Sequence, residues 1–198
     1  MEGRIAALGL GLLAVVAGLA GCRSGSSGPR MPVGQVWVYR VVAPPMRYVE
    51  EVKAVQPVAV FDAPGVEFRS GLGNSRVAWK DGELFASQLN QTRFVPPIAV
   101  SATAAKRHHG RVEAYGKVTP FSARILPEKD PVDVQVDQTT LKARKTVIQG
   151  RMGDRNLEIH TYVHSSKGIV RQEEWINDRL TLRLELVAMR DPSGNPIP

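Results

Sequence analysis

The chain has 198 residues, of which 43% are hydrophobic and 23% are charged, and its formal net charge is +7. It contains a single cysteine, which excludes a fold held together by intramolecular disulfides. The length and apolar content suffice for one domain with a hydrophobic core, and the sequence shows no internal repeat and no long charged block.

The N-terminal residues have the pattern of a secretory signal peptide. Arg4 supplies a positive charge, and an uncharged apolar run follows from Ile5 to Ala20. This run is marginal as a transmembrane helix, because about 20 apolar residues are needed to cross a bilayer. We therefore expect residues 1–21 to be an export signal that is cleaved.

Leu19, Ala20, Gly21 and Cys22 resemble the lipobox of bacterial lipoproteins. The resemblance implies that cleavage occurs before Cys22, which would then carry a diacylglycerol group and an acylated amino group. Two or more acyl chains make a stable membrane anchor, so no second membrane element is needed. The alternatives are an ordinary signal peptide with an incidental cysteine and an anchor that is not cleaved.

The segment after the cysteine is expected to be a lipidated flexible tether over residues 22–32, because it is rich in glycine and serine. Arg23 stands where an aspartate would signal retention in enterobacterial lipoproteins. By that resemblance, the protein is expected in the outer membrane of the cell envelope, facing the periplasm.

Residues 33–198 are interpreted as a single β-rich domain, because apolar side chains recur with a period of two. The segments with this pattern are 35–42, 76–87, 132–137 and 156–164. Asp81 and Gly82 are suited to a tight hairpin turn, as are Asn177 and Asp178. Close to the C-terminus, an unbroken apolar face is predicted for Leu180, Leu182, Leu184 and Leu186.

The one helix expected is Ile98–His109, on its alanines, a possible serine cap and Gly110 as a stop. The predicted fold class is therefore mainly β. We expect a curved antiparallel sheet, as a half-barrel or open barrel, with at most one or two short helices.

Gly34, Trp37 and Tyr39 near the start, and the segment Lys167–Trp175 near the end, resemble those of uncharacterised bacterial envelope lipoproteins with curved sheets. Outer-membrane lipoprotein carrier and receptor proteins have such a half-barrel sheet, closed by a helix over an apolar cavity. The resemblance implies a lipid-facing interior lined by Trp37, Tyr39, Trp79 and Leu184.

The segment from Lys106 to Arg111 is a candidate contact for an anionic surface. Its members are Lys106, Arg107, His108, His109 and Arg111, and each cation near such a surface is worth on the order of 1 kcal/mol. The alternative is a solvated loop. The positive net charge could also suit nucleic acid, but an exported protein would not meet nucleic acid as a partner.

No metal or cofactor site is expected. His160 and His164 share a strand face but lie about 13 Å apart along it, too far to share one ion. The neighbours Glu50 and Glu51, like Glu173 and Glu174, point to opposite faces of a strand and cannot form an acid/base dyad with each other.

No catalytic residue is predicted, since the sequence has no serine elbow and no zinc-protease helix. The leading hypothesis is a membrane-anchored envelope lipoprotein that acts as a non-enzymatic binding or assembly module. One alternative is a carrier or receptor for an acyl chain. The other is an envelope hydrolase acting on an anionic polymer, which would require convergence in a cleft of two or more of His108, His109, His160, His164, Glu173 and Asp133.

Overall fold

The structure is a computed structural model that describes Gly28 and residues 31–198. The expected signal peptide, Cys22 and most of the expected tether lie outside the described residues.

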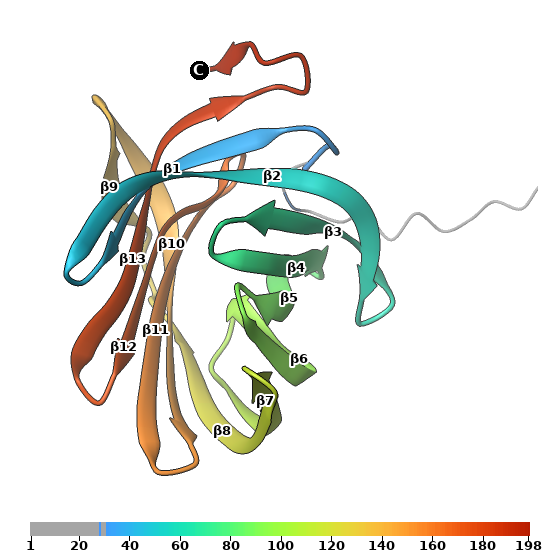
Figure 1. The fold of residues 1–198 in the computed structure, drawn as a ribbon, viewed down its shortest axis with the longest axis vertical. Helices are drawn as coiled ribbons and strands as arrows, with labels where there is room; N and C mark the ends of the chain where they lie inside the picture. The colour runs from blue at the N-terminus through green and yellow to red at the C-terminus, as the bar shows by residue number, and fades with distance from the viewer. Residues whose placement is uncertain (1–27, 29–30) are drawn as a thin grey trace, which may run out of the picture.

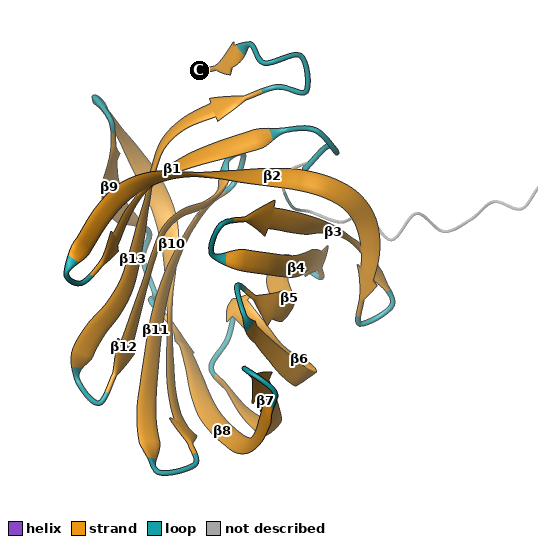
Figure 2. Ribbon diagram, in the orientation of Figure 1, coloured by secondary structure: helices purple, strands orange, loops and turns teal. Residues whose placement is uncertain are grey.

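The described part of the chain consists of strands and short connections, without helices (Figures 1 and 2). The strands are β1 (Val36–Ala43), β2 (Met46–Val60), β3 (Ala63–Ser70), β4 (Gly73–Lys80), β5 (Glu83–Leu89), β6 (Thr92–Ser101), β7 (Lys106–Ala114), β8 (Lys117–Pro127), β9 (Val132–Val136), β10 (Thr139–Met152), β11 (Arg155–His164), β12 (Gly168–Ile176), β13 (Arg179–Arg190) and β14 (Pro196–Ile197). No helix in this part is long and apolar enough to cross a bilayer.

Each strand pairs antiparallel with its neighbour, and β1 pairs with β13, so that β1 to β8 and β10 to β13 form a closed barrel of twelve strands. The short β9 pairs with the first part of β10, and β14 extends the edge of β13. In Figure 1, β3 and β4 run across the view while β11, β12 and β13 run up it. The predicted curved antiparallel sheet is confirmed, and its curvature continues until the sheet closes.

The pleat places one face of each strand in the barrel interior. The core is continuous around the barrel and includes Trp37, Phe68, Phe94, Ile125 and Ile148. On β13, Leu182, Leu184 and Leu186 are buried as predicted, but Leu180 lies beyond a bulge opposite Trp175 and is only partly buried. The turn predictions are confirmed: φ is positive at Asp81 and Gly82, and at Asn177 and Asp178.

The helix expected over Ile98–His109 is wrong, because this segment forms the end of β6 and the start of β7. Helix propensity is a weak preference, and here the burial of Ile98 and Val100 in the barrel outweighs it. Gly110 is not a helix stop. A Cβ on Gly110 would lie 2.3 Å from the carbonyl oxygen of Val95, so the glycine permits close approach of two strands.

Candidate functional site

The four side chains expected to face a lipid are all buried in the barrel interior. Trp37 Nε1 donates to the carbonyl of Lys167 at 2.9 Å, and Tyr39 Oη donates to the carbonyl of Ile169 at 2.7 Å. Burial raises the pKa of Tyr39 far above its ordinary value, so the phenol stays protonated and remains a donor. Trp79 packs beneath Gly28, where a Cβ would lie 2.0 Å from its ring.

Trp37, Tyr39 and Leu184 also line an inner cavity of about 70 Å³, with Met31 at its edge. A water molecule occupies about 30 Å³ of liquid. The cavity therefore has room for a few small atoms, and the centre of the barrel is packed.

The five residues of the basic segment do not form one patch, because β7 directs alternate side chains to opposite faces. Lys106 Nζ lies 2.5 Å from Glu83 Oε2. His108 points inward and packs against Phe121, with ring centroids 5.7 Å apart. Burial, with a smaller contribution from the charge of His109, lowers the pKa of His108.

Arg107, His109 and Arg111 project outward from β7. Arg111 pairs with Glu113, with Nε and Oε1 3.3 Å apart. Arg107 and His109 instead line a groove of about 560 Å³ on the outer wall of the barrel.

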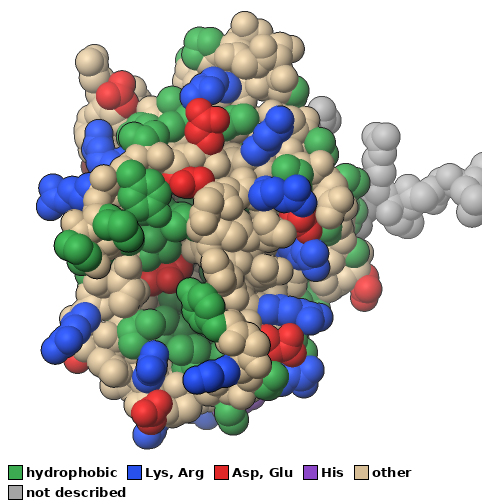
Figure 3. Space-filling view, viewed as in Figure 1, with side chains coloured by type: hydrophobic (Ala, Val, Ile, Leu, Met, Phe, Trp, Pro, Cys, Tyr) green, Lys and Arg blue, Asp and Glu red, His purple; other side chains and the backbone are tan. Residues whose placement is uncertain are grey.

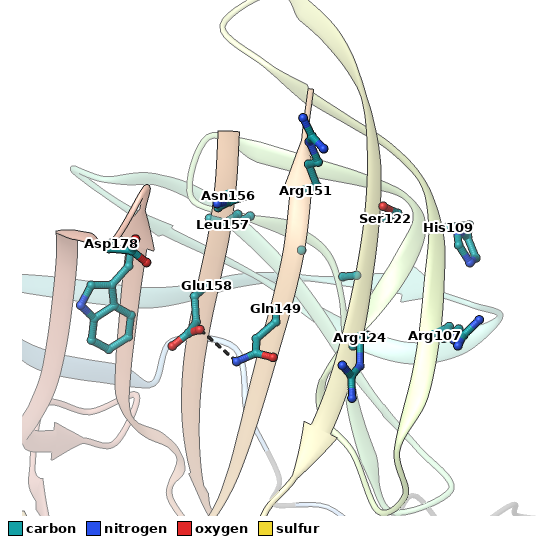
Figure 4. Close-up of a pocket in the computed structure, with 13 residues that line it drawn as sticks. Arg107, His109, Ser122, Arg124, Gln149, Arg151, Asn156, Leu157, Glu158 and Asp178 are labelled. Carbon is teal, nitrogen blue, oxygen red and sulfur yellow. Dashed lines mark hydrogen bonds between the residues drawn. The ribbon is translucent and has the colours of Figure 1, made fainter. Parts of the chain in front are cut away.

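The groove is built from two rows of directly paired residues across neighbouring strands (Figure 4). The first row follows Arg107 on β7, Arg124 on β8, Gln149 on β10, Glu158 on β11 and Trp175 on β12. Figure 4 shows the labelled members of this row, on β7, β8, β10 and β11, projecting on the same side of the sheet.

The second row follows His109, Ser122, Arg151 and Asn156. Ser122, Asn156 and the amide of Gln149 offer neutral hydrogen-bonding groups beside the cations. The two rows thus place cationic, neutral and acidic side chains next to one another across neighbouring strands.

The floor of the groove is positively charged at its β7–β8 side. Arg107 and Arg124 are directly opposite each other on paired strands, and both are exposed. Neither forms an ion pair with any residue of the described chain. Like charges directly opposite in a sheet are destabilising, so this pair has no structural benefit of its own.

The far wall of the groove carries an acid and an aromatic ring whose positions are fixed. Glu158 accepts from Gln149 Nε2 at 3.1 Å, the bond marked in Figure 4, and lies 2.7 Å from His160 Nε2. The His160 ring packs against Trp175 with centroids 4.5 Å apart. These contacts engage Glu158 with Gln149 and His160, and none of them involves Arg107 or Arg124.

The residues that the hydrolase hypothesis required to converge are mostly separated. His160 and Glu173 do meet, with Nδ1 and Oε2 3.8 Å apart, but Glu173 is held by Arg171 and Arg183. His108 lies inside the barrel, and Asp133 pairs with Lys142 on the β9–β10 hairpin at 2.7 Å.

His164 contacts Ser166 at the turn that follows β11. In the part of the chain that the structure describes, no group of three or more His, Cys, Asp or Glu side chains could hold a metal ion.

The sequence reasoning missed Arg124, Arg151 and Trp175, which come from three different strands. Each follows the period-two alternation and points away from an apolar face, and this signal places them on the outside. Only the register between strands brings them beside Arg107 and His109, and the alternation along a single strand does not specify that register.

No protein-family model matches the chain, and no curated protein matches it. Among solved structures, the chain is similar to a "putative lipoprotein" of Parabacteroides distasonis, with 13% identity, coverage of 83% of this chain and 98% of that chain, and a TM-score of 0.55. A "putative exported protein with YmcC-like fold" from Bacteroides fragilis aligns over the same shares of both chains with 10% identity and a TM-score of 0.48. The likeness to the Parabacteroides protein is one of fold.

Proposed function

We propose that this chain is a lipid-anchored protein of the cell envelope, in the outer membrane and facing the periplasm, that works as a non-enzymatic binding module. Its ligand is an anionic component of the envelope, held through phosphate or carboxylate groups in the outer groove. The observation that carries this proposal is the pair Arg107 and Arg124, which lie directly opposite each other in the groove.

An anionic ligand bound between the two arginines would attract both guanidinium groups and offset their mutual repulsion. Guanidinium groups present donors in a fork that matches carboxylate and phosphate oxygens. Arg151 adds a third guanidinium group in the next row, which also contains the imidazole of His109. The exposed face of Trp175 offers an apolar surface at the far wall.

The anchoring part of the proposal rests on the lipobox at Cys22. The fold likeness to a protein described as a "putative lipoprotein" supports it. In the Cys22→Ser protein, acylation and partition into membranes should be lost. Full membrane partition of that variant would contradict the lipid anchor.

The groove supports this function better than the inner cavity lined by Trp37, Tyr39 and Leu184 supports an acyl-chain carrier. An acyl chain in the centre of the barrel would need several times the 70 Å³ present there. A hydrolase is also less favoured, because Glu173, the member of the required set that meets His160, is already paired with two arginines.

Binding is tested with the mature, acylated protein in a non-ionic detergent. Polygalacturonate serves as a polymeric carboxylate, inorganic polyphosphate as a phosphate polymer, and dextran as the neutral control. We expect both anions to bind with an affinity that falls as salt rises, because exposed charges are screened. Dextran should bind at least about tenfold more weakly.

The double variant Arg107→Gln/Arg124→Gln should lower the affinity for the anions by about tenfold or more. The matched control is Arg47→Gln/Lys129→Gln, which removes two exposed cations outside the groove. Equal losses in both variants would mean that only net charge matters, and would refute the groove as the site.

A further inference from the structure

A second cavity, of about 740 Å³, opens at the end of the barrel where six hairpin turns gather. These are the turns β1–β2, β3–β4, β5–β6, β7–β8, β10–β11 and β12–β13, each of which contributes lining residues. Figure 3 shows a hollow on this face, with hydrophobic side chains inside it and Lys and Arg side chains around it. We refer to this cavity as the barrel mouth.

The barrel mouth has an apolar wall. Leu89, Val112 and Leu182 are buried behind it, and Leu72 and Met152 pack against the core at its surface. The volume lies within the range of small-molecule pockets, which is about 300–1,000 Å³. A ligand with an apolar segment could therefore bury that segment here.

The same wall contains one carboxyl group, that of Glu174. Its Oε1 accepts a hydrogen bond from Gln172 Nε2 at 2.7 Å, and no cation of the described chain pairs with it. Burial raises the pKa of Glu174, and the Gln172 hydrogen bond offsets this only in part.

The other buried carboxylates of the barrel all have cation partners. Glu67 lies 2.8 Å from Arg76 Nε, Glu83 lies 2.5 Å from Lys106 Nζ, and Glu173 is held by Arg171 and Arg183. Glu174, which is partly buried and lines a cavity, differs from them because its partner is the neutral amide of Gln172 and not a cation.

The rim of the mouth carries the opposite sign of charge. Lys117 and Arg155 are exposed at the ends of β8 and β11, with Asp154 as the acid among the lining residues of the rim. This balance favours a negatively charged group at the entrance and disfavours a cation. The side chain of Tyr115, 82% exposed, adds an aromatic surface at the same entrance.

We infer that the barrel mouth binds an amphipathic anion, with its apolar segment against Leu72, Met152 and Leu182 and its charged head at Lys117 and Arg155. Glu174 forms a hydrogen bond to the ligand at the floor of the cavity. This site is separate from the outer groove, since the two share no lining residue. The inference therefore stands or falls independently of the proposed function.

The test uses the mature, acylated protein in phosphatidylcholine nanodiscs with isotope-labelled methionine methyl groups. The probe is octyl phosphate, and octyltrimethylammonium is the probe with the same chain and the opposite charge. Met152 lines the mouth, whereas Met189 is buried in the core outside it, so the two methyl groups report site and control. Each resonance is assigned by a Met→Leu substitution.

We expect octyl phosphate to shift the Met152 resonance until saturation while the Met189 resonance stays in place. Octyltrimethylammonium should bind about tenfold more weakly. Ala114→Trp, which fills the mouth, should abolish the Met152 response. The control Ala105→Trp adds the same ring at an exposed position between β6 and β7 and should leave the response intact.

Lys117→Glu/Arg155→Glu should weaken the binding of octyl phosphate and strengthen that of the cationic probe. The inference is overturned if Met152 does not respond to octyl phosphate, or if the cationic probe binds more tightly to the native protein. The latter result would mean that Glu174 pairs with an ammonium group. An unchanged response in Ala114→Trp would place the bound probe elsewhere.

Discussion

Glu173 and Glu174 are consecutive residues of β12 that face opposite sides of the barrel wall. Glu173 lies on the outside, 4% exposed, among Arg171, Arg183 and His160. Glu174 lies on the inside and has a single amide partner. Because successive side chains of a strand face opposite sides, β12 carries an ion-paired carboxylate on its outer face and, at the next position, a carboxyl without a cation partner on its inner face.

Replacement of the outer carboxylate should destabilise the barrel. Glu173→Gln leaves Arg171 and Arg183 without their shared acceptor, although both arginine side chains keep about a third of their surface in water. We expect a loss of about 2 kcal/mol in the free energy of unfolding, less than for a fully buried pair. Urea denaturation measures it, and a loss below about 0.5 kcal/mol would mean that solvent replaces the carboxylate.

Replacement of the inner carboxyl should have the opposite effect at neutral pH. The folded-state pKa of Glu174 is raised above the ordinary 4.5, so the folded protein binds more protons than the unfolded chain above that pH. Stability contributed by this group therefore falls as pH rises from about 4.5 and is unaffected below it.

Glu174→Gln should consequently raise the melting temperature at neutral pH by a few degrees, since 1 kcal/mol shifts it by about 2–4 °C at this size. The gain should disappear near pH 4, where the unfolded chain is protonated as well. A variant that melts lower than the native protein at every pH would show that the carboxyl makes a favourable contact.

Much of the fold follows from the sequence because burial on one face of a strand imposes a period of two. The alternation in Val132–Val136 and in Arg155–His164 is strong, and both are strands. Around Ile98 the alternation is weak and alanines dominate, and there the pairing with β5 decides the structure. Closure of the barrel, through β1 and β13, joins segments too distant for any local pattern to reveal.

The residues of the candidate site could be predicted from the sequence only in part. Arg107 and His109 stand in a visible basic run, but the same run contains Lys106 and His108, which the pleat turns elsewhere. Arg124 becomes part of the candidate site only through the strand register, which places it opposite Arg107. The density of charge along the chain therefore pointed to β7 but not to the groove between β7 and β12.

Reversal of one charge in the groove should distinguish an effect on ligand binding from an effect on stability. Arg124→Glu places an acid directly opposite Arg107, and a cross-strand pair of opposite charges contributes roughly 0.2–1 kcal/mol. We expect a small gain in the free energy of unfolding, together with a loss of at least about tenfold in affinity for polygalacturonate. If affinity and stability fall together, the variant has damaged the fold and the assignment needs Arg124→Gln instead.

The phenol of Tyr39 ties β1 to the start of β12 through the Ile169 carbonyl. Tyr39→Phe removes the donor and leaves a buried acceptor, which should cost about 1–2 kcal/mol in the free energy of unfolding. The control is Tyr115→Phe, at a side chain 82% exposed, where no change is expected. An equal effect of the two substitutions would argue that the Tyr39 hydrogen bond contributes nothing.

His108 should make the barrel sensitive to mild acid. Its folded-state pKa is lowered from the ordinary 6.5, mainly by burial and also by the charge of His109. Just below pH 6.5 the unfolded chain therefore binds a proton at this residue, whereas the folded protein does not. Stability is then complete above about pH 6.5 and falls as pH drops below it. His108→Leu should flatten this fall between about pH 7 and pH 5, because no proton can then be taken up at this position.

The exposed neighbour provides the comparison, since His109→Leu removes a histidine that projects outward from the same strand. Thermal melts of both variants between about pH 7 and pH 5 show which histidine causes the acid sensitivity. If His109→Leu flattens the profile and His108→Leu does not, the acid sensitivity arises in the outer groove and not in the barrel interior.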